Sequence, residues 1–191
     1  MGNNAVRRIC LDGILISLFL VFGLIRIRLG FLEIGLGTLV ITIAAIALGP
    51  IDAILIALLG EFVNQILFSG YGLTPTTPLW IAPVVIRAAI LSLIAWLYRR
   101  KGDALPNHKV IYFLAIMGTA LIISGIDTGI LYLDGIIMGY PVSYTVAQTF
   151  LRFGASQITA VLVGLLVLPL YKAVLFLLPK DERRGEKTQE E

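Results

Sequence analysis

The sequence predicts an all-α integral membrane protein, a six-transmembrane-helix bundle with both termini in the cytoplasm. Three observations support this fold class: the apolar composition, six apolar stretches separated by turn signals, and an uneven distribution of lysine and arginine. Hydrophobic residues make up 58% of the 191-residue chain and charged residues 14%, whereas soluble domains contain roughly 45–50% and about 25%. A chain this poor in charge cannot cover a soluble globule with polar surface. A bilayer suits it, at roughly 20 apolar residues per span.

The apolar stretches give the boundaries of the predicted helices and of one membrane domain, residues 1–179. The first stretch follows Arg7 and Arg8 and lacks a signal-peptide cleavage site, so it is predicted to be a retained helix. Gly49 and Pro50 form a turn signal that predicts a tight connection between the second and third helices. The charged tail, 180–191, is predicted to be disordered and cytoplasmic. The predicted helices cover residues 9–25, 36–48, 51–68, 79–97, 110–133 and 142–178.

The connecting segments differ in character. Residues 26–33 carry charges in an alternating pattern, which predicts an external loop or a short hairpin. Residues 69–78 have no charge and are rich in Gly, Pro and Thr, while residues 99–109 form a basic loop. A turn is predicted around Asp134 and Gly135, leading to Pro141 at the start of the sixth helix.

The positions of lysine and arginine orient the bundle. With both termini inside, eleven of the fifteen basic residues fall on the cytoplasmic side, and only Arg26 and Arg28 fall outside. Arg87 and Arg152 lie inside predicted spans. This bias follows the positive-inside rule and predicts a multi-pass membrane protein, with the bilayer and not nucleic acid as its partner.

Four ionisable residues inside the spans are the strongest functional signal: Glu61, Arg87, Asp127 and Arg152. An ionised group near the bilayer centre costs at least ~2.5–3.5 kcal/mol and needs a partner or a wet cavity. At ~1.5 Å per residue, the first three lie roughly 10 Å, and Arg152 ~15 Å, below the outer helix ends.

Helical spacing places polar neighbours beside these charges. Asn64 and Gln65 share a face with Glu61, and Asp134 shares one with Asp127. Aromatic residues near the outer ends would form the walls of a pocket with amides and charges at its base, as in sites for small polar ligands. The predicted substrate-binding residues are Arg87, Asn64, Gln65, Glu61, Asp127, Arg152, Gln148, Tyr71, Trp80 and Tyr144.

Structural explanations exist for the same residues. Two acids and two arginines can form buried ion pairs that hold the bundle together. Tyrosines and tryptophans can form an interfacial belt, and Asn64 and Gln65 can join helices.

Known catalytic and metal-binding motifs are absent from the sequence. It has no phosphate-binding loop ending in Lys-Ser/Thr, no His-Glu-x-x-His and no Gly-x-Ser-x-Gly, so neither ATP hydrolysis nor another enzyme activity is expected. Cys10 is the single cysteine and His108 the single histidine, so no metal site and no cofactor are predicted.

Several segments together are similar to one family. Gly13 and Ser17 form a small-xxx-small pair on the first helix, where the family typically has two alanines. Residues 37–50 resemble its second helix with the Gly-Pro end, and a Gly/Pro-rich outer loop follows the third helix. From about Val6 to Leu178 the chain thus resembles the substrate-binding S components of energy-coupling factor (ECF) vitamin transporters.

The resemblance implies a mechanism, partners and a location in the plasma membrane of a prokaryote. S components bind a vitamin from outside under outer loops, here 26–35, 69–78 and 134–140. They associate with a membrane scaffold (T) subunit and two cytoplasmic ATPase subunits, and topple in the membrane to release the vitamin inward. Gly13 and Ser17 would lie at the docking surface for the T subunit.

The intramembrane arginines favour an anionic vitamin. Arg87 is the expected clamp for a carboxylate, as in pantothenate or folate, because arginine binds carboxylates through two parallel hydrogen bonds. A riboflavin-like or pyridoxine-like cargo is the alternative. The rival function is a membrane scaffold of the cell-shape type with structural ion pairs. A channel would need polar residues in both halves of the bundle, and the inner half is nearly bare of them.

Overall fold

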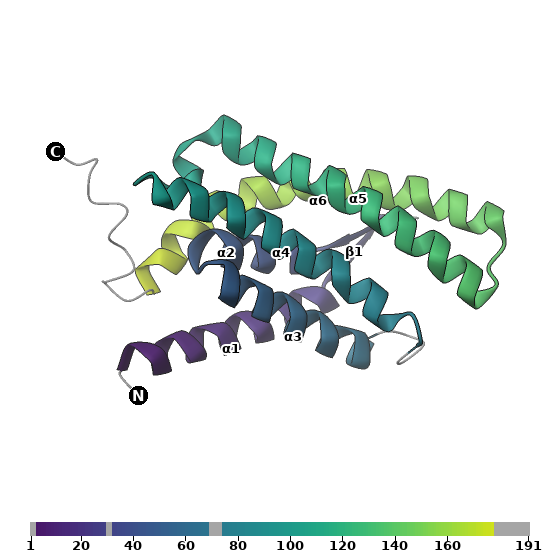
Figure 1. Cartoon of the computed structure of the whole chain (residues 1–191), viewed down its shortest axis with the longest axis horizontal. Helices are drawn as coiled ribbons and strands as arrows, with labels where there is room; N and C mark the ends of the chain where they lie inside the picture. The colour runs from purple at the N-terminus through teal and green to yellow at the C-terminus, as the bar shows by residue number, and fades with distance from the viewer. Residues whose placement is uncertain (1–2, 30–31, 69–73, 178–191) are drawn as a thin grey trace.

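The computed structural model describes residues 3–29, 32–68 and 74–177 (Figure 1). Within these ranges the chain forms six α helices, one short 3-10 helix and one two-stranded hairpin, so the predicted number of helices is confirmed there. The predicted tail, 180–191, lies outside the described residues. In chain order the elements are α1 (Asn3–Leu24), β1 (Arg26–Leu29), β2 (Leu32–Gly35), α2 (Gly37–Ala47), α3 (Pro50–Phe68), α4 (Thr77–Arg100), η1 (Leu105–Asn107), α5 (Lys109–Met138) and α6 (Val142–Leu177).

The helices run along the long axis of the molecule, and α1 begins at the same end at which α6 finishes (Figure 1). Four of them, α3 to α6, are long and apolar enough to cross a membrane. Helix α2 has only 11 residues, which amounts to ~16 Å and is about half of a ~30 Å hydrocarbon core. It therefore cannot reach across the bilayer by itself.

Helix α2 forms the centre of the bundle. It packs against α1, α3, α4 and α6, and every residue in it except Thr38 is buried. Val40, Ile41, Ala44 and Ala45 have no exposed surface at all. A helix that is apolar on all sides is expected in the interior of a bundle, and here the sequence pattern and the position agree.

Small residues allow α1 to approach α2 and α3 closely. The ring of Phe19 on α1 packs against Gly37 and Gly60. A Cβ atom on Gly60 would lie 2.7 Å from Cδ1 of that ring, and one on Gly37 would lie 3.1 Å from Cε2. Both glycines are thus required by the close approach of an aromatic side chain.

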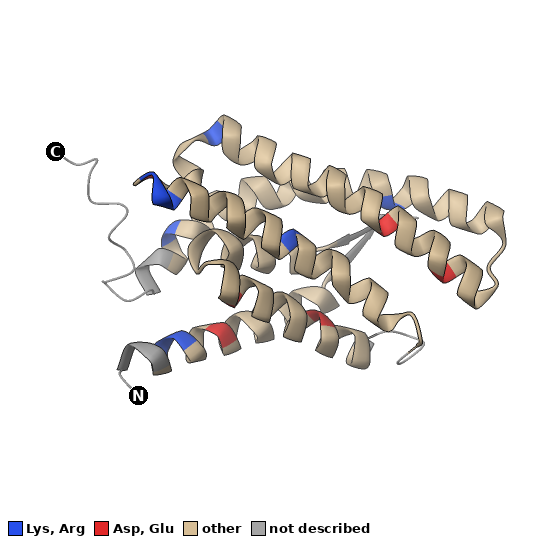
Figure 2. Cartoon of the chain, in the orientation of Figure 1, with Lys and Arg blue, Asp and Glu red and all other residues tan. Residues whose placement is uncertain are grey.

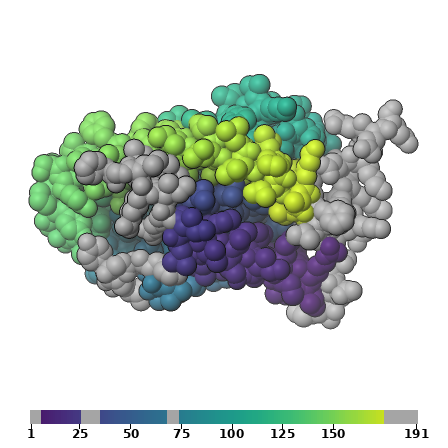
Figure 3. Space-filling view, turned by 180° about the vertical axis from the view of Figure 1, so that it is seen from behind, coloured from purple at the N-terminus to yellow at the C-terminus, as the bar shows by residue number. Residues whose placement is uncertain are grey.

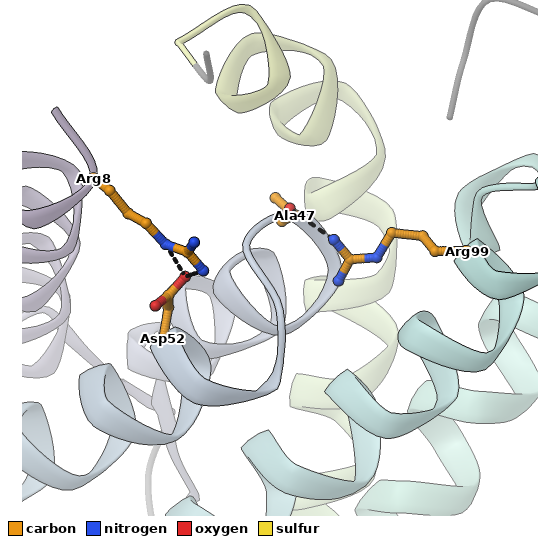
Figure 4. A network of polar contacts seen from close by, with 4 residues as sticks. All are labelled: Arg8, Ala47, Asp52 and Arg99. Carbon is orange, nitrogen blue, oxygen red and sulfur yellow. Dashed lines mark hydrogen bonds and ion pairs between the residues drawn. The ribbon is translucent and has the colours of Figure 1, made fainter. Parts of the chain in front are cut away.

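The end of the bundle that contains the α2–α3 turn is held by two arginines (Figure 4). Nε of Arg8 on α1 donates to Oδ2 of Asp52 in the first turn of α3, at 2.8 Å. Nη1 of Arg99 on α4 donates to the carbonyl of Ala47 at the end of α2, at 3.3 Å. The predicted tight turn follows directly, with Gly49 at φ 130°.

The segment after α1 is a hairpin, which was one of the two structures expected from its sequence. Strands β1 and β2 pair antiparallel, with Arg26 opposite Gly35 and Leu29 opposite Leu32. The hairpin contacts α6 and the end of α1. It therefore adds a small sheet to a fold that was predicted to be wholly helical.

The predicted turn around Asp134 and Gly135 is wrong, because α5 continues through both residues to Met138. Gly135 lies inside the helix and faces α6, where a Cβ atom would be 3.0 Å from Oγ1 of Thr145. The helix ends instead at Gly139, which has φ 73°, a left-handed conformation typical of glycine after a helix. The third predicted outer loop, 134–140, is thus mostly helical.

Candidate functional site

A pocket of about 480 Å³ lies at the end of the bundle opposite to the start of α1 and the end of α6. It is enclosed by the end of α3, the start of α4, the end of α5 and the start of α6. Its volume lies within the ~300–1,000 Å³ of small-molecule sites. We refer to it as the main pocket. Its lining consists of Gln65, Thr74, Thr76, Trp80, Leu131, Asp134, Met138, Tyr140, Pro141, Tyr144 and Arg152.

Arg152 and Trp80 form one side of the main pocket. Cζ of Arg152 on α6 lies 4.6 Å from the centre of the Trp80 ring, which belongs to the first turns of α4. A cation over the face of an indole ring at this distance is attracted by the ring quadrupole. The contact fixes both side chains and joins α4 to α6.

Another part of the lining is aromatic and apolar. The rings of Tyr140 and Tyr144 meet edge to face, with centres 5.5 Å apart and planes at 62°. Leu131 and Met138 of α5 add apolar surface beside them. Flat aromatic ligands are well suited to such walls, because rings prefer offset-stacked or edge-on contacts.

Polar groups in and beside the lining come from α5, from the turn before α4 and from the start of α4. Asp134 is the acid in the lining, and Arg152 is its basic counterpart. Oγ1 of Thr74 lies 3.0 Å from Oγ1 of Thr76 and 3.2 Å from Oγ1 of Thr77. Because the lining carries one positive and one negative side chain, its net charge is zero.

The acidic and amide side chains of α3 divide between two cavities. Gln65 lines the main pocket, and its Nε2 donates to Oε1 of Glu61 at 2.7 Å. Nδ2 of Asn64 donates to Oε2 of the same carboxylate at 3.2 Å. Glu61 and Asn64 line a separate cavity of about 260 Å³ beside Phe19. The sequence placed all three in one pocket. Gln65 follows Asn64 directly, however, and a helix turns by about 100° per residue, so these two neighbours face different cavities.

Arg87, the expected clamp, does not line the main pocket. It is seven residues beyond Trp80 on α4, which places it ~10 Å deeper in the bundle. It lies beside a small internal space lined by threonines of α2, α5 and α6. Arg87 and Trp80, which were expected to share a pocket, line different spaces in the structure.

Asp127 interacts electrostatically with both intramembrane arginines, Arg87 and Arg152. With Arg152 it lines a small space between α5 and α6. Gln148 is half-buried on α6 and lines none of these cavities. Tyr71 lies outside the described residues.

Gly13 and Ser17 belong to α1, the helix that Figure 3 shows in purple. Both are exposed, and Oγ of Ser17 donates to the carbonyl of Gly13 at 2.9 Å. No described atom lies within 4 Å of where a Cβ atom of Gly13 would be. This face of α1 is thus open to another protein or to lipid.

No group of three His, Cys, Asp or Glu side chains that could hold a metal occurs among the described residues. His108 has another partner, since its Nε2 lies 2.6 Å from Oδ2 of Asp103. Hydrogen bonds from Asn107 and then from His108 hold the pKa of Asp103 below its usual value. The pair belongs to the connection between α4 and α5, at the far end from the main pocket.

The pocket residues that the sequence analysis missed are Thr74, Thr76, Leu131, Met138 and Pro141. A signal for two of them was present. Residues 127, 131, 134 and 138 follow one helical face, but the turn predicted at Asp134 concealed this periodicity.

Comparison with known protein families assigns the chain to one of them. A sequence model of the family described as "ECF-type riboflavin transporter, S component" matches residues 3–175. The chain belongs to this family. A comparison with curated proteins gave no match.

Family membership confirms the resemblance found in the sequence. ECF S components are the substrate-binding subunits of vitamin transporters, not enzymes, and they work with T and ATPase modules. Together with the four apolar helices, membership makes this chain a membrane-embedded transporter subunit. The rival scaffold function of the cell-shape type is not supported.

Proposed function

We propose that this S component binds riboflavin in the main pocket and delivers it for import. The observation that carries the proposal is a pocket with aromatic walls and no net charge, in a chain of the riboflavin family. Riboflavin has a flat tricyclic ring and a hydroxylated chain, and it is uncharged at neutral pH. Trp80, Tyr140 and Tyr144 suit the ring, and Gln65, Thr74 and Asp134 suit the hydroxyl groups.

Pantothenate and folate, the cargoes favoured by the sequence, are supported less well. A carboxylate cargo needs an arginine that is free to form two parallel hydrogen bonds. Arg87 lies outside the main pocket, and Arg152 stacks on Trp80. The charge of Arg152 also interacts with that of Asp127, and Asp134 adds a negative side chain to the lining.

We further propose that both termini are cytoplasmic and that the main pocket opens to the outside. In the described part of the chain, most lysines and arginines lie at the end where α1 begins and α6 finishes (Figure 2), and cytoplasmic ends carry this excess. The exposed face of α1 around Gly13 and Ser17 is the proposed docking surface for the T subunit, which pairs with two ATPase subunits.

A titration in detergent tests the cargo. The chain has two tryptophans: Trp80 in the main pocket, and Trp96, which stacks under Arg100 near the other end of α4. Riboflavin should quench tryptophan fluorescence in the natural protein and in Trp96→Phe. Trp80→Phe is the matched variant, and its remaining fluorescence should not respond. Calorimetry with the same ligands measures affinity independently of fluorescence.

The outcomes separate the alternatives. Saturable binding of riboflavin, with pantothenate and folate inert, supports the proposal. Tight binding of pantothenate or folate by folded protein, with no response to riboflavin, would restore the carboxylate cargo. Quenching that persists in Trp80→Phe would place the ligand away from the main pocket.

A further inference from the structure

A polar site lies in the middle of the bundle, separate from the main pocket. Arg87, near the midpoint of α4, lines a space of about 20 Å³ whose walls come from four helices. The hydroxyl-bearing residues around it are Thr38 and Thr42 of α2, Thr119 of α5 and Thr159 of α6.

The guanidinium of Arg87 is incompletely satisfied by the protein. Its Nε is buried and has no hydrogen-bond partner among the described residues. Asp127 supplies a nearby opposite charge. A buried donor without a partner is costly inside a membrane protein, because lipid offers no replacement for water.

Three of the four threonines around this space, Thr38, Thr42 and Thr119, already donate their hydroxyl hydrogens to backbone carbonyls. The hydroxyl of Thr42 donates to the carbonyl of Thr38 at 2.8 Å, and that of Thr119 donates to the carbonyl of Ala115 at 2.7 Å. The hydroxyl of Thr38 donates to Gly35, at 3.3 Å. What these side chains still offer is oxygen lone pairs, which are acceptors.

An arginine donor facing hydroxyl acceptors needs a group that can both accept and donate. A water molecule does both, whereas an anion can only accept and would face the lone pairs of the threonines. The space exceeds the ~10–15 Å³ that one water requires, and a buried water needs about two to four polar partners.

We infer that the space beside Arg87 is a binding site for one buried water, which accepts from Arg87 Nε and donates to the hydroxyl oxygens of Thr42 and Thr119. The water links α4 to α2 and α5. Arg87 thereby stabilises the bundle, not the cargo, and the identity of the vitamin does not affect the site.

Matched threonine variants test the site without removing the arginine. Thr42→Val and Thr119→Val keep the side-chain shape and remove one acceptor each. Thr149→Val is the control, because its hydroxyl donates to the carbonyl four residues earlier, at 2.9 Å, but lies outside this space. Thermal unfolding in detergent should show Tm values about 3 °C lower for the first two than for the control. Equal Tm values for all three variants would overturn the inference.

Two further measurements address the ligand itself. A structure at high resolution should show density for one atom between Arg87 Nε and the two threonine hydroxyls, and clear absence of such density would contradict the site. Replacing chloride by gluconate should leave the Tm of the natural protein unchanged. If Tm falls on this replacement in the natural protein but not in Arg87→Met, the site holds an anion and the water is excluded.

Discussion

At the scale of single residues, the charges of the bundle form a connected set. Arg152 contacts Trp80 in the main pocket and shares a small space with Asp127. Asp127 in turn interacts electrostatically with Arg87, deeper in the membrane. Because Asp127 offsets the positive charge of both arginines, it influences the charge preference of the main pocket without lining it.

Removal of the charge of Asp127 should therefore alter selectivity. In Asp127→Asn, Arg152 loses roughly 1 kcal/mol of compensating attraction, and the affinity for riboflavin 5′-phosphate should rise about fivefold relative to riboflavin. Calorimetry with both ligands measures the ratio. Thr128→Val changes the same small space without a charge and should keep the natural ratio. An unchanged ratio in Asp127→Asn would show that this carboxylate does not set the preference.

At the scale of elements, close packing of α1 on its neighbours depends on glycine. Phe19 is seated against Gly60 of α3 and Gly37 of α2. Gly118 of α5 provides a contrast, since no described atom lies within 4 Å of where its Cβ would be. Replacement of glycine by alanine should thus affect stability differently at Gly60 and at Gly118.

Gly60→Ala should destabilise the protein by about 1–3 kcal/mol, because the added methyl group displaces the Phe19 ring. Gly118→Ala should be neutral or stabilise by up to about 1 kcal/mol, through reduced backbone freedom of the unfolded chain. Unfolding in a denaturing detergent measures both. A Gly60→Ala protein as stable as Gly118→Ala would mean that Phe19 can move aside at no cost.

Sequence reasoning was sufficient for elements whose ends carry local signals. The Gly49–Pro50 turn was predicted because those residues have strong local preferences. The end of α5 was misplaced because Gly135, which resembles a turn glycine, is needed for close contact with Thr145 of α6. That contact is a tertiary property, and no signal within the segment reports it.

The site was predicted only in part, because tertiary packing leaves no signal in the local sequence. Gln65, Trp80, Tyr144 and Arg152 were expected near the outer ends of their helices and do line one pocket. The positions of Glu61, Asn64 and Arg87 depend on how each helix is rotated and on exact depth. Periodicity defines a helical face, but only packing decides which cavity that face meets.

At the scale of the whole molecule, the two ends of the bundle differ in charge and in whether they contain the main pocket. The basic end contains the start of α1, the end of α6 and the compact α2–α3 turn (Figure 2). The other end contains the main pocket. This polarity suits a protein that takes its ligand from one side of a membrane and meets soluble ATPases on the other.

Cysteine accessibility tests the proposed orientation. In a Cys10→Ser background, Lys109→Cys at the start of α5 should react with a membrane-impermeant maleimide only in inside-out vesicles. Val142→Cys at the start of α6 should react only in right-side-out vesicles, and both positions are exposed. The reverse pattern would invert the topology, and labelling of both from one side would contradict a full crossing by α5.

The enclosed position of α2 has a consequence for how the protein is made. A helix of 11 residues cannot satisfy its terminal backbone groups while alone in hydrocarbon. We therefore expect α2 to enter the bilayer together with α3, as a unit joined at Gly49 and Pro50. Because α6 also packs against α2, the centre of the molecule stays uncovered until the last helix leaves the ribosome. Biogenesis of this subunit therefore ends in the late closure of a core that was synthesised early.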